Sequence, residues 1–212
     1  MANHSPLLTR RSFLAATGFL VLPTVGFAAS RRGAVVTILG DSITAGLGLP
    51  ASESLPAQLQ IALRKLKPGA VVRGAGVSGD TTAGGLARVG FSVQDDTDLC
   101  VVALGGNDVL QGVDPKVTEA NLDAIVKKLR ARKIKVLIAG LAAPGDLGGA
   151  YAREFSAVFP AVAKANGVAV YPNLLAGVAL DQKFNQGDGI HPNAEGVKIV
   201  ARGLAPAVAK AL

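Results

Sequence analysis

The chain has 212 residues, half of them apolar and 4% aromatic, with a formal net charge of +7. This size and composition are sufficient for one globular domain with its own hydrophobic core. The basic residues are scattered and are not interleaved with aromatic ones, which argues against a nucleic-acid-binding protein.

Residues 1–29 have the features of an export signal. Arg10-Arg11-Ser12-Phe13-Leu14 precedes a moderately apolar stretch that ends at Val25, and small residues around Ala28 offer a cleavage site. The paired arginines favour the twin-arginine route over an ordinary secretory signal. The apolar stretch is too short to predict a permanent membrane span. We therefore expect a periplasmic or secreted protein whose mature domain covers residues 30–212.

From residue 34 onward, short apolar runs alternate with segments of helical spacing. Strands are expected at residues 34–39, 70–73, 99–104, 134–139 and 168–171. Helices are expected at residues 53–66, 82–93, 115–132, 150–165 and 193–212. This alternation predicts an α/β fold, a three-layer α/β/α sandwich with a five-stranded parallel sheet in the flavodoxin-like order 2-1-3-4-5.

Sites in open parallel sheets lie at the carboxyl ends of the strands. Four polar or glycine-rich segments fall there in the predicted fold. They are Gly40-Asp41-Ser42, residues 76–80, residues 105–108 and the loop before His191. The fold is expected to bring these segments to one edge.

His191 is the only histidine outside the export signal, because the other, His4, lies within it. It is therefore the candidate base, and Asp188, three residues earlier, can orient its ring. Ser42 follows the first strand and is the candidate nucleophile, since a serine hydroxyl needs a base to become reactive. Taken alone, Ser42 would be expected to cap a helix. The presence of the base and its carboxylate favours catalysis.

Acyl transfer also needs hydrogen-bond donors for the oxyanion that develops on the substrate. The backbone N–H of Gly79 and the side-chain amide of Asn107 follow the second and third strands and can serve. Each residue on its own would be explained by a turn.

Together, these segments resemble the SGNH (GDSL) hydrolase family, which is named for a Ser, a Gly, an Asn and a His in separate blocks. The matching blocks are Gly40–Gly46, Gly76–Thr82, Leu104–Asp108 and Asp188–Asn193. The resemblance covers nearly the whole mature chain. It is strongest to the bacterial branch of arylesterases, acyl-CoA thioesterases and lysophospholipases.

The resemblance implies a serine esterase that acts on a small-molecule ester substrate. Ser42 would attack the ester carbonyl, His191 would act as general base and acid, and Asp188 would orient His191. The oxyanion hole would consist of the N–H groups of Ser42 and Gly79 and the amide of Asn107. The resemblance implies no cofactor, and the single cysteine and single mature histidine are too few for the usual zinc site. Cys100, inside an apolar run, is expected to be buried and inert.

One loop departs from the family branch. Gly145 stands directly after Pro144, where the branch usually has an asparagine. In the resembling enzymes the loop, residues 142–151 here, borders the acyl pocket, so the departure leaves the triad intact but leaves the substrate range open. Acyl chain length and leaving group also stay open.

Two other functions are compatible with parts of the sequence. Gly74–Gly79 matches the G-x-G-x-x-G pattern of dinucleotide-binding proteins, but it follows the second strand instead of the first. A carbohydrate acetylesterase on the same fold is the other alternative, and the absence of Trp with only two Tyr argues against it. No serine has the G-x-S-x-G context of an α/β-hydrolase.

Overall fold

The structure is a computed structural model that describes residues 1–2, 32–143 and 149–212. The chain divides into two units, Met1–Arg31 and Arg32–Leu212. All described helices and strands belong to the second unit. The expected export signal, residues 1–29, lies outside the described residues apart from its first two.

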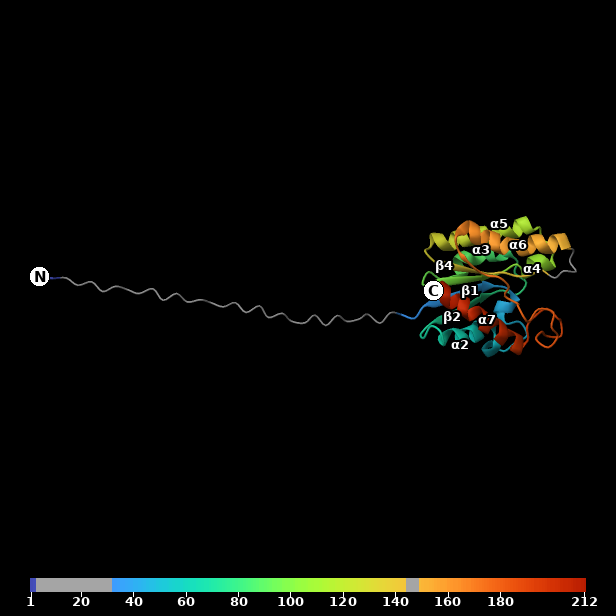
Figure 1. Cartoon of the computed structure of the whole chain (residues 1–212), viewed down its shortest axis with the longest axis horizontal. Coiled ribbons are helices and arrows are strands. Elements are labelled where there is room, and N and C mark those ends of the chain that lie inside the picture. Colours follow the sequence, from blue (N-terminus) through green and yellow to red (C-terminus); the bar gives the residue numbers. More distant parts are fainter. Residues whose placement is uncertain (3–31, 144–148) are drawn as a thin grey trace. The chain divides into compact units, whose positions relative to one another are not determined.

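The second unit is built on a five-stranded parallel sheet in the order β2-β1-β3-β4-β5 (Figure 1). The predicted strand order is therefore confirmed. The central strands β1 and β3 are buried along their whole length, as apolar strands between two helical layers must be. The strands are β1 (Val35–Gly40), β2 (Val71–Gly76), β3 (Leu99–Ala103), β4 (Lys135–Ala139) and β5 (Ala169–Tyr171).

Helices cover both faces of the sheet, which confirms the three layers. Figure 1 shows α2 and α7 packed on one face and α3, α5 and α6 on the other. The long helices bury an apolar face against the sheet, as α2 does with Leu55, Leu59 and Leu63 at helical spacing. The helices are α1 (Ser42–Ala45), α2 (Leu55–Arg64), α3 (Thr82–Ser92), α4 (Gly106–Leu110), α5 (Pro115–Ala131), α6 (Gly149–Asn166) and α7 (Ala194–Ala211), with a 3₁₀ turn, η1, at Ala51–Glu53.

The structure differs from the prediction around β2. The strand was expected to end at residue 73, but it continues to Gly76, and Gly74 and Gly76 pair with Ile38 and Gly40 of β1. The first half of the Gly74–Gly79 segment is thus extended sheet. A phosphate-binding loop needs a turn there, so the geometry does not support the dinucleotide alternative.

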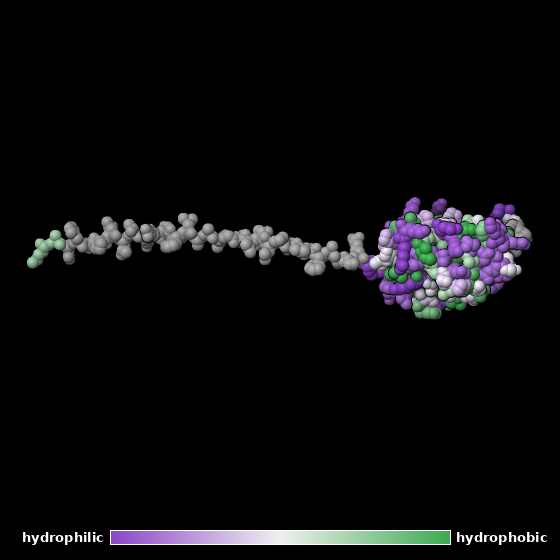
Figure 2. Space-filling model, turned by 90° about the horizontal axis from the view of Figure 1, so that it is seen from below, coloured by the Kyte–Doolittle hydropathy of each residue, from purple (hydrophilic) through white to green (hydrophobic). Residues whose placement is uncertain are grey.

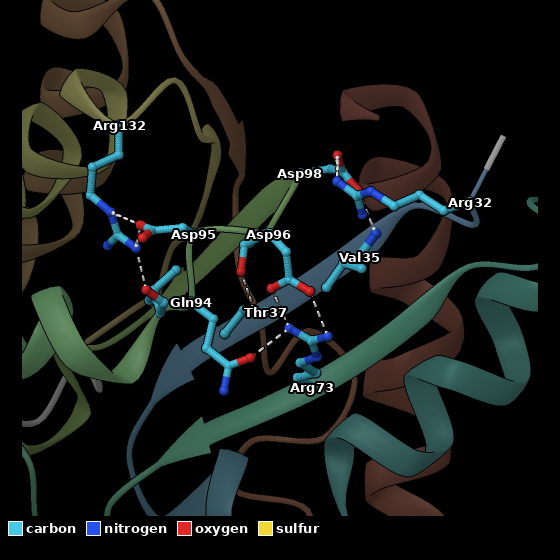
Figure 3. Close-up of polar contacts among 11 residues, drawn as sticks. Arg32, Val35, Thr37, Arg73, Gln94, Asp95, Asp96, Asp98 and Arg132 are labelled. Atoms are coloured by element: carbon cyan, nitrogen blue, oxygen red, sulfur yellow. Dashed lines mark hydrogen bonds and ion pairs between the residues drawn. The ribbon is translucent and has the colours of Figure 1, made fainter.

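Ion pairs close the amino end of the sheet, where Gln94–Asp98 leads into β3 (Figure 3). Three aspartates of this segment each contact an arginine from a different part of the chain. The pairs are Asp95–Arg132 at 2.8 Å, Asp96–Arg73 at 2.6 Å and Asp98–Arg32 at 2.9 Å. Solvent-exposed pairs of this kind contribute roughly 0–1 kcal/mol each. These pairs hold together segments at the amino edge of the sheet. The polar segments that follow β1, β2 and β3 lie at the opposite, carboxyl edge.

The surface of the second unit is mixed in character. On the side of α2, Figure 2 shows hydrophobic residues in small separate areas among hydrophilic ones. Within the described ranges, none of the helices is both long and apolar enough to span a membrane.

Candidate active site

The carboxyl edge of the sheet brings together the serine, histidine and aspartate predicted from the sequence. The Ser42 hydroxyl lies 2.9 Å from Nε2 of His191, although 149 residues separate the two in the chain. On the other side of the ring, Nδ1 lies 2.6 Å from Oδ2 of Asp188. This is the hydrogen-bonded sequence of nucleophile, base and orienting carboxylate that nucleophilic catalysis requires.

A tight loop holds His191 in place. Oδ1 of Asp188 accepts hydrogen bonds from the backbone N–H groups of Ile190 and His191, at 2.9 and 3.0 Å. The carbonyl of His191 accepts from the backbone N–H of Gln186 at 2.7 Å. Asn193 then caps α7, and its side-chain oxygen accepts from the first turn of that helix. The histidine therefore sits between a closed loop and a capped helix.

Ser42 is placed by the close approach of α1 to the ends of β1 and β2. Glycine is required in both strands, because a Cβ on Gly40 would lie 2.1 Å from the Thr44 hydroxyl and one on Gly76 would lie 2.3 Å from the backbone nitrogen of Ala45. Asp41 caps α1 by accepting a hydrogen bond from the N–H of Ile43 at 3.0 Å. Ser42 is thus the first residue of a short helix directly after a buried strand.

The two carboxylates next to the serine and histidine have opposite electrostatic environments. Burial raises the pKa of Asp41 from 3.8 to about 6, against the lowering effect of the Ile43 hydrogen bond. Hydrogen bonds from the backbone of His191 and Ile190 and from the imidazole lower the pKa of Asp188 to about 2. Asp188 is therefore ionised throughout the neutral range and can stabilise a positively charged imidazole ring.

The oxyanion donors predicted from the sequence lie at the same edge. Gly79 is in a left-handed turn after β2, with φ of +84°, and nothing would contact a Cβ there within 4 Å. Asn107 lies in α4, directly after β3, and one of its amide protons is donated to the carbonyl of Asp80 at 2.8 Å. An amide has two N–H donors, so the second stays available. The N–H of Ser42, in the first turn of α1, has no acceptor within that helix.

A buried carboxylate braces the loop that carries Asn107. Asp108 is 1% exposed and accepts hydrogen bonds from the N–H and hydroxyl of Thr82, at 2.8 and 2.5 Å. These bonds tie the start of α4 to the start of α3. Asp108 therefore has a structural role and holds the segment that carries Asn107.

Other candidate groups lie elsewhere. Cys100 is fully buried in β3 and burial raises the pKa of its thiol to about 12, so it is not a nucleophile. The described residues contain no group of three or more His, Cys, Asp or Glu side chains that could hold a metal ion. The loop expected to border the acyl pocket, 142–151, includes residues 144–148, which lie outside the described residues.

The hollow beside Ser42 and His191 is small. A cavity of about 10 Å³, lined in part by Ser42, Leu47 and His191, has room for about one water molecule. A larger cavity of about 340 Å³ lies at the amino ends of β4 and β5 and is lined by Arg130, Lys133 and Lys135 among others. It contains neither a candidate nucleophile nor a base, so the chemistry is assigned to the smaller site.

Comparisons with known proteins show what this chain is similar to. The sequence profile of the GDSL-like Lipase/Acylhydrolase family matches residues 38–199. Esterase TesA of Pseudomonas aeruginosa is 42% identical over 156 residues, which cover 73% of this chain and 78% of that protein. Thioesterase 1/protease 1/lysophospholipase L1 of Escherichia coli K12 is 36% identical over 188 residues, or 88% of each chain. The crystal structure of AlinE4, an SGNH-hydrolase family esterase, has a TM-score of 0.71 at 43% identity, and the match covers 85% of this chain and 97% of that one.

Proposed function

The chain belongs to the GDSL-like lipase/acylhydrolase family and is an SGNH-type ester hydrolase, and we propose that it cleaves carboxylic esters through an acyl-enzyme formed on Ser42. The observation that carries the proposal is the hydrogen-bonded sequence Ser42–His191–Asp188, with its 2.9 and 2.6 Å contacts.

In the first half of the reaction, the Ser42 oxygen attacks the ester carbonyl carbon while Nε2 of His191 takes the hydroxyl proton. Asp188 holds the proton on Nδ1 and stabilises the imidazolium that forms. The carbonyl oxygen becomes an oxyanion and accepts hydrogen bonds from the N–H groups of Ser42 and Gly79 and from the amide of Asn107. The imidazolium then protonates the leaving alcohol as the carbon–oxygen bond breaks.

In the second half, water replaces the alcohol. His191 removes a proton from the water, which attacks the acyl carbon. The imidazolium then gives this proton to the Ser42 oxygen as the bond between that oxygen and the acyl carbon breaks, which releases the acid. Because a neutral imidazole is needed at both steps, activity is expected to fall as acid protonates the base. A constant rate between pH 5 and 8 would exclude His191 as that base.

The substrate range is a finer proposal. Two relatives of the chain are named as an esterase and as a thioesterase and lysophospholipase. We propose that the substrates are aryl esters or short-to-medium acyl esters, with acyl thioesters and lysophospholipids as further candidates.

The experiment that tests the function uses the mature protein, p-nitrophenyl esters of increasing chain length, acyl-CoA and lysophosphatidylcholine. Ser42→Ala and His191→Ala should each lower kcat/KM at least about a thousandfold, because nucleophile and base act as a unit. A phosphonate ester should add one adduct per chain, on Ser42, as measured by mass spectrometry. Retained activity in Ser42→Ala, or an adduct on another residue, would contradict the assignment.

We further propose that residues 1–29 direct export, with the twin-arginine route favoured by Arg10-Arg11. The test is the N-terminal sequence of protein recovered from the periplasm, with a variant in which both arginines are lysines. Export of that variant at the normal rate would point to the ordinary secretory route.

A further inference from the structure

We propose that Arg88 and Asp80 form a positioning pair that aligns the donors of the oxyanion hole. This inference rests on the proposed function, since it concerns the same site. Neither side chain was assigned a role from the sequence, and neither contacts Ser42 or His191 among the described hydrogen bonds.

Arg88 is an unusual residue for its place in the fold. It lies on α3, yet it is only 7% exposed, and a buried guanidinium is stable only where its N–H groups find acceptors. Nε donates to Oδ2 of Asp80 at 2.5 Å, Nη1 to the carbonyl of Ala75 at 2.8 Å and Nη2 to the carbonyl of Gly40 at 2.7 Å. Each of the three guanidinium nitrogens therefore has an acceptor.

The three acceptors belong to segments that carry oxyanion donors. Gly40 ends β1, two residues before Ser42. Ala75 lies near the end of β2, whose following turn carries Gly79. Asp80 directly follows Gly79, and its carbonyl accepts the amide proton of Asn107 at 2.8 Å. One guanidinium thus links the ends of two strands and, through Asp80, the start of α4.

Gly79 needs this support more than the other donors. It is exposed, has a positive φ and has no side chain, so side-chain packing does not fix the direction of its N–H. Asp80 fixes the direction of the Gly79 N–H instead. The N–H of Asp80 donates to the carbonyl of Val77 at 3.1 Å, and the Asp80 side chain accepts from Arg88. Because Asp80 is held at the end of the turn, the N–H of Gly79 before it points in one direction.

Asp80 also selects the orientation of Asn107. With one amide proton on the Asp80 carbonyl, the other is free for the substrate oxygen and the amide is kept from rotating. A small displacement of Asp80 therefore moves two donors at once. Since the charges of Arg88 and Asp80 offset each other, the pair acts chiefly through geometry.

The test compares Arg88→Lys, Asp80→Asn and a matched control, Arg73→Lys. Arg73 also pairs with a carboxylate, that of Asp96, at 2.6 Å, but at the amino edge of the sheet. A lysine has one nitrogen and cannot contact three separate acceptors as the planar guanidinium does. We expect Arg88→Lys and Asp80→Asn to lower kcat for p-nitrophenyl acetate by about 10- to 100-fold with KM within about threefold. Arg73→Lys should stay within about twofold of the parent.

A second measurement separates positioning from general damage to the fold. An arylboronic acid forms a tetrahedral adduct with the serine and places an oxygen in the oxyanion hole, so its affinity should fall in parallel with kcat in both site variants. The circular dichroism and the thermal unfolding of each variant show whether the protein is folded. If Arg88→Lys does not fold, Asp80→Asn and the double variant Arg88→Met/Asp80→Asn, which removes both charges, replace it.

Unchanged kcat and boronic acid affinity in the folded variants would overturn the inference. So would a rise in KM alone, since positioning of oxyanion donors acts on the transition state. Failure of the proposed function is distinguishable, because it would appear in Ser42→Ala regardless of what the Arg88 and Asp80 variants do.

Discussion

Asp188 holds the loop before His191 and also contacts the imidazole ring, and a substitution can separate these two roles. Its Oδ1 holds the loop through the N–H groups of Ile190 and His191, while Oδ2 faces the imidazole. In Asp188→Asn the amide oxygen can satisfy the loop, which turns the NH₂ group toward Nδ1. The ring proton is then forced onto Nε2, where it blocks proton removal from Ser42.

We therefore predict that Asp188→Asn lowers kcat/KM by roughly 10³- to 10⁴-fold, at least as much as Asp188→Ala, which leaves the tautomer free. Steady-state rates on p-nitrophenyl acetate near pH 7.5 provide the comparison. An Asn variant within tenfold of the parent would mean that the carboxylate is not needed to set the tautomer.

Asp41 makes stability depend on pH. Its pKa is raised to about 6 by burial, so the folded state binds this proton more tightly than the unfolded state does. The stability of the parent protein is thus reduced as the pH rises from about 4 to about 6. We predict that Asp41→Asn, which does not titrate and keeps an acceptor for Ile43, gains up to about 3 kcal/mol relative to the parent over that interval.

Urea unfolding of both proteins at pH 4 and pH 7 measures the gain. Asp96→Asn is a suitable control, because the hydrogen bond from Arg73 lowers the pKa of that exposed carboxyl and little change is expected above pH 4. A difference between Asp41→Asn and the parent that stays constant with pH would show that Asp41 is ionised at little cost.

Among single residues, the sequence indicated those that we propose to contact the substrate but not the pair Arg88 and Asp80. His191 could be predicted because no other histidine is present outside residues 1–29, and Asp188 because it is close to His191 in the chain. Arg88 could not be predicted, since arginine on a helix is usually exposed. Only the folded chain shows that two strand ends supply acceptors for it.

At the scale of elements, two helices end with the same hydrogen-bond pattern but different residues. In α5 the N–H of Lys133 donates to Arg130 and that of Ile134 to Leu129. In α6 the N–H of Gly167 donates to Lys164 and that of Val168 to Ala163. The residue after the cap has φ of 61° at Lys133 and 60° at Gly167. Glycine adopts this left-handed conformation without strain, whereas lysine does not.

Lys133→Gly is accordingly predicted to raise the free energy of unfolding by about 0.5–1 kcal/mol, and Gly167→Lys to lower it by about 1 kcal/mol. A side chain at residue 167 would meet nothing within 4 Å, so only backbone strain is changed. Both residues lie at the amino edge, and esterase activity should not change. Chemical denaturation is the measurement, and shifts of the same sign in both variants would contradict the explanation.

The long helices were predictable because their apolar spacing repeats over several turns, which short helices cannot show. The helix expected at 115–132 is found at Pro115–Ala131, because Asp114 and Pro115 mark its start and apolar spacing repeats over several turns. Helices α1 and α4 have four and five residues, too few for a period to appear. They form because the chain must turn sharply where β1 and β3 end.

For the whole molecule, the predicted strand order indicated which segments lie side by side at the candidate site, which no single motif could do. Placing β1 between β2 and β3 makes the residues after these strands neighbours, and that is where Ser42, Gly79 and Asn107 lie. The acyl pocket was not predictable in the same way, because its expected loop departs from the family pattern at Gly145. The substrate panel described above addresses that question directly.

The boundary of the folded unit gives the last prediction. Arg32 contacts Asp98 through two hydrogen bonds, and Asp98 also accepts from the N–H of Val35 at 2.7 Å (Figure 3). The carbonyl of Ala34 accepts from the N–H of Val71 at 2.8 Å, one residue before β1 begins. A chain that starts at Ser30 keeps all these contacts. One that starts at Val35 loses Arg32 as a partner of Asp98 and loses the bond from Val71 to the Ala34 carbonyl.

We predict that the chain from Ser30 unfolds at the same temperature as the full chain and has the same kcat/KM, while the chain from Val35 loses roughly 1–3 kcal/mol of stability. Arg32→Ala in the chain from Ser30 isolates the exposed ion pair and should cost less than about 1 kcal/mol. The measurements are the unfolding temperature and the rate of ester hydrolysis of each of these chains, compared with those of the full chain. An unchanged temperature for the chain from Ser30, together with a less stable chain from Val35, would support the proposed boundary at residue 30. A lower unfolding temperature for the chain from Ser30 would contradict that boundary.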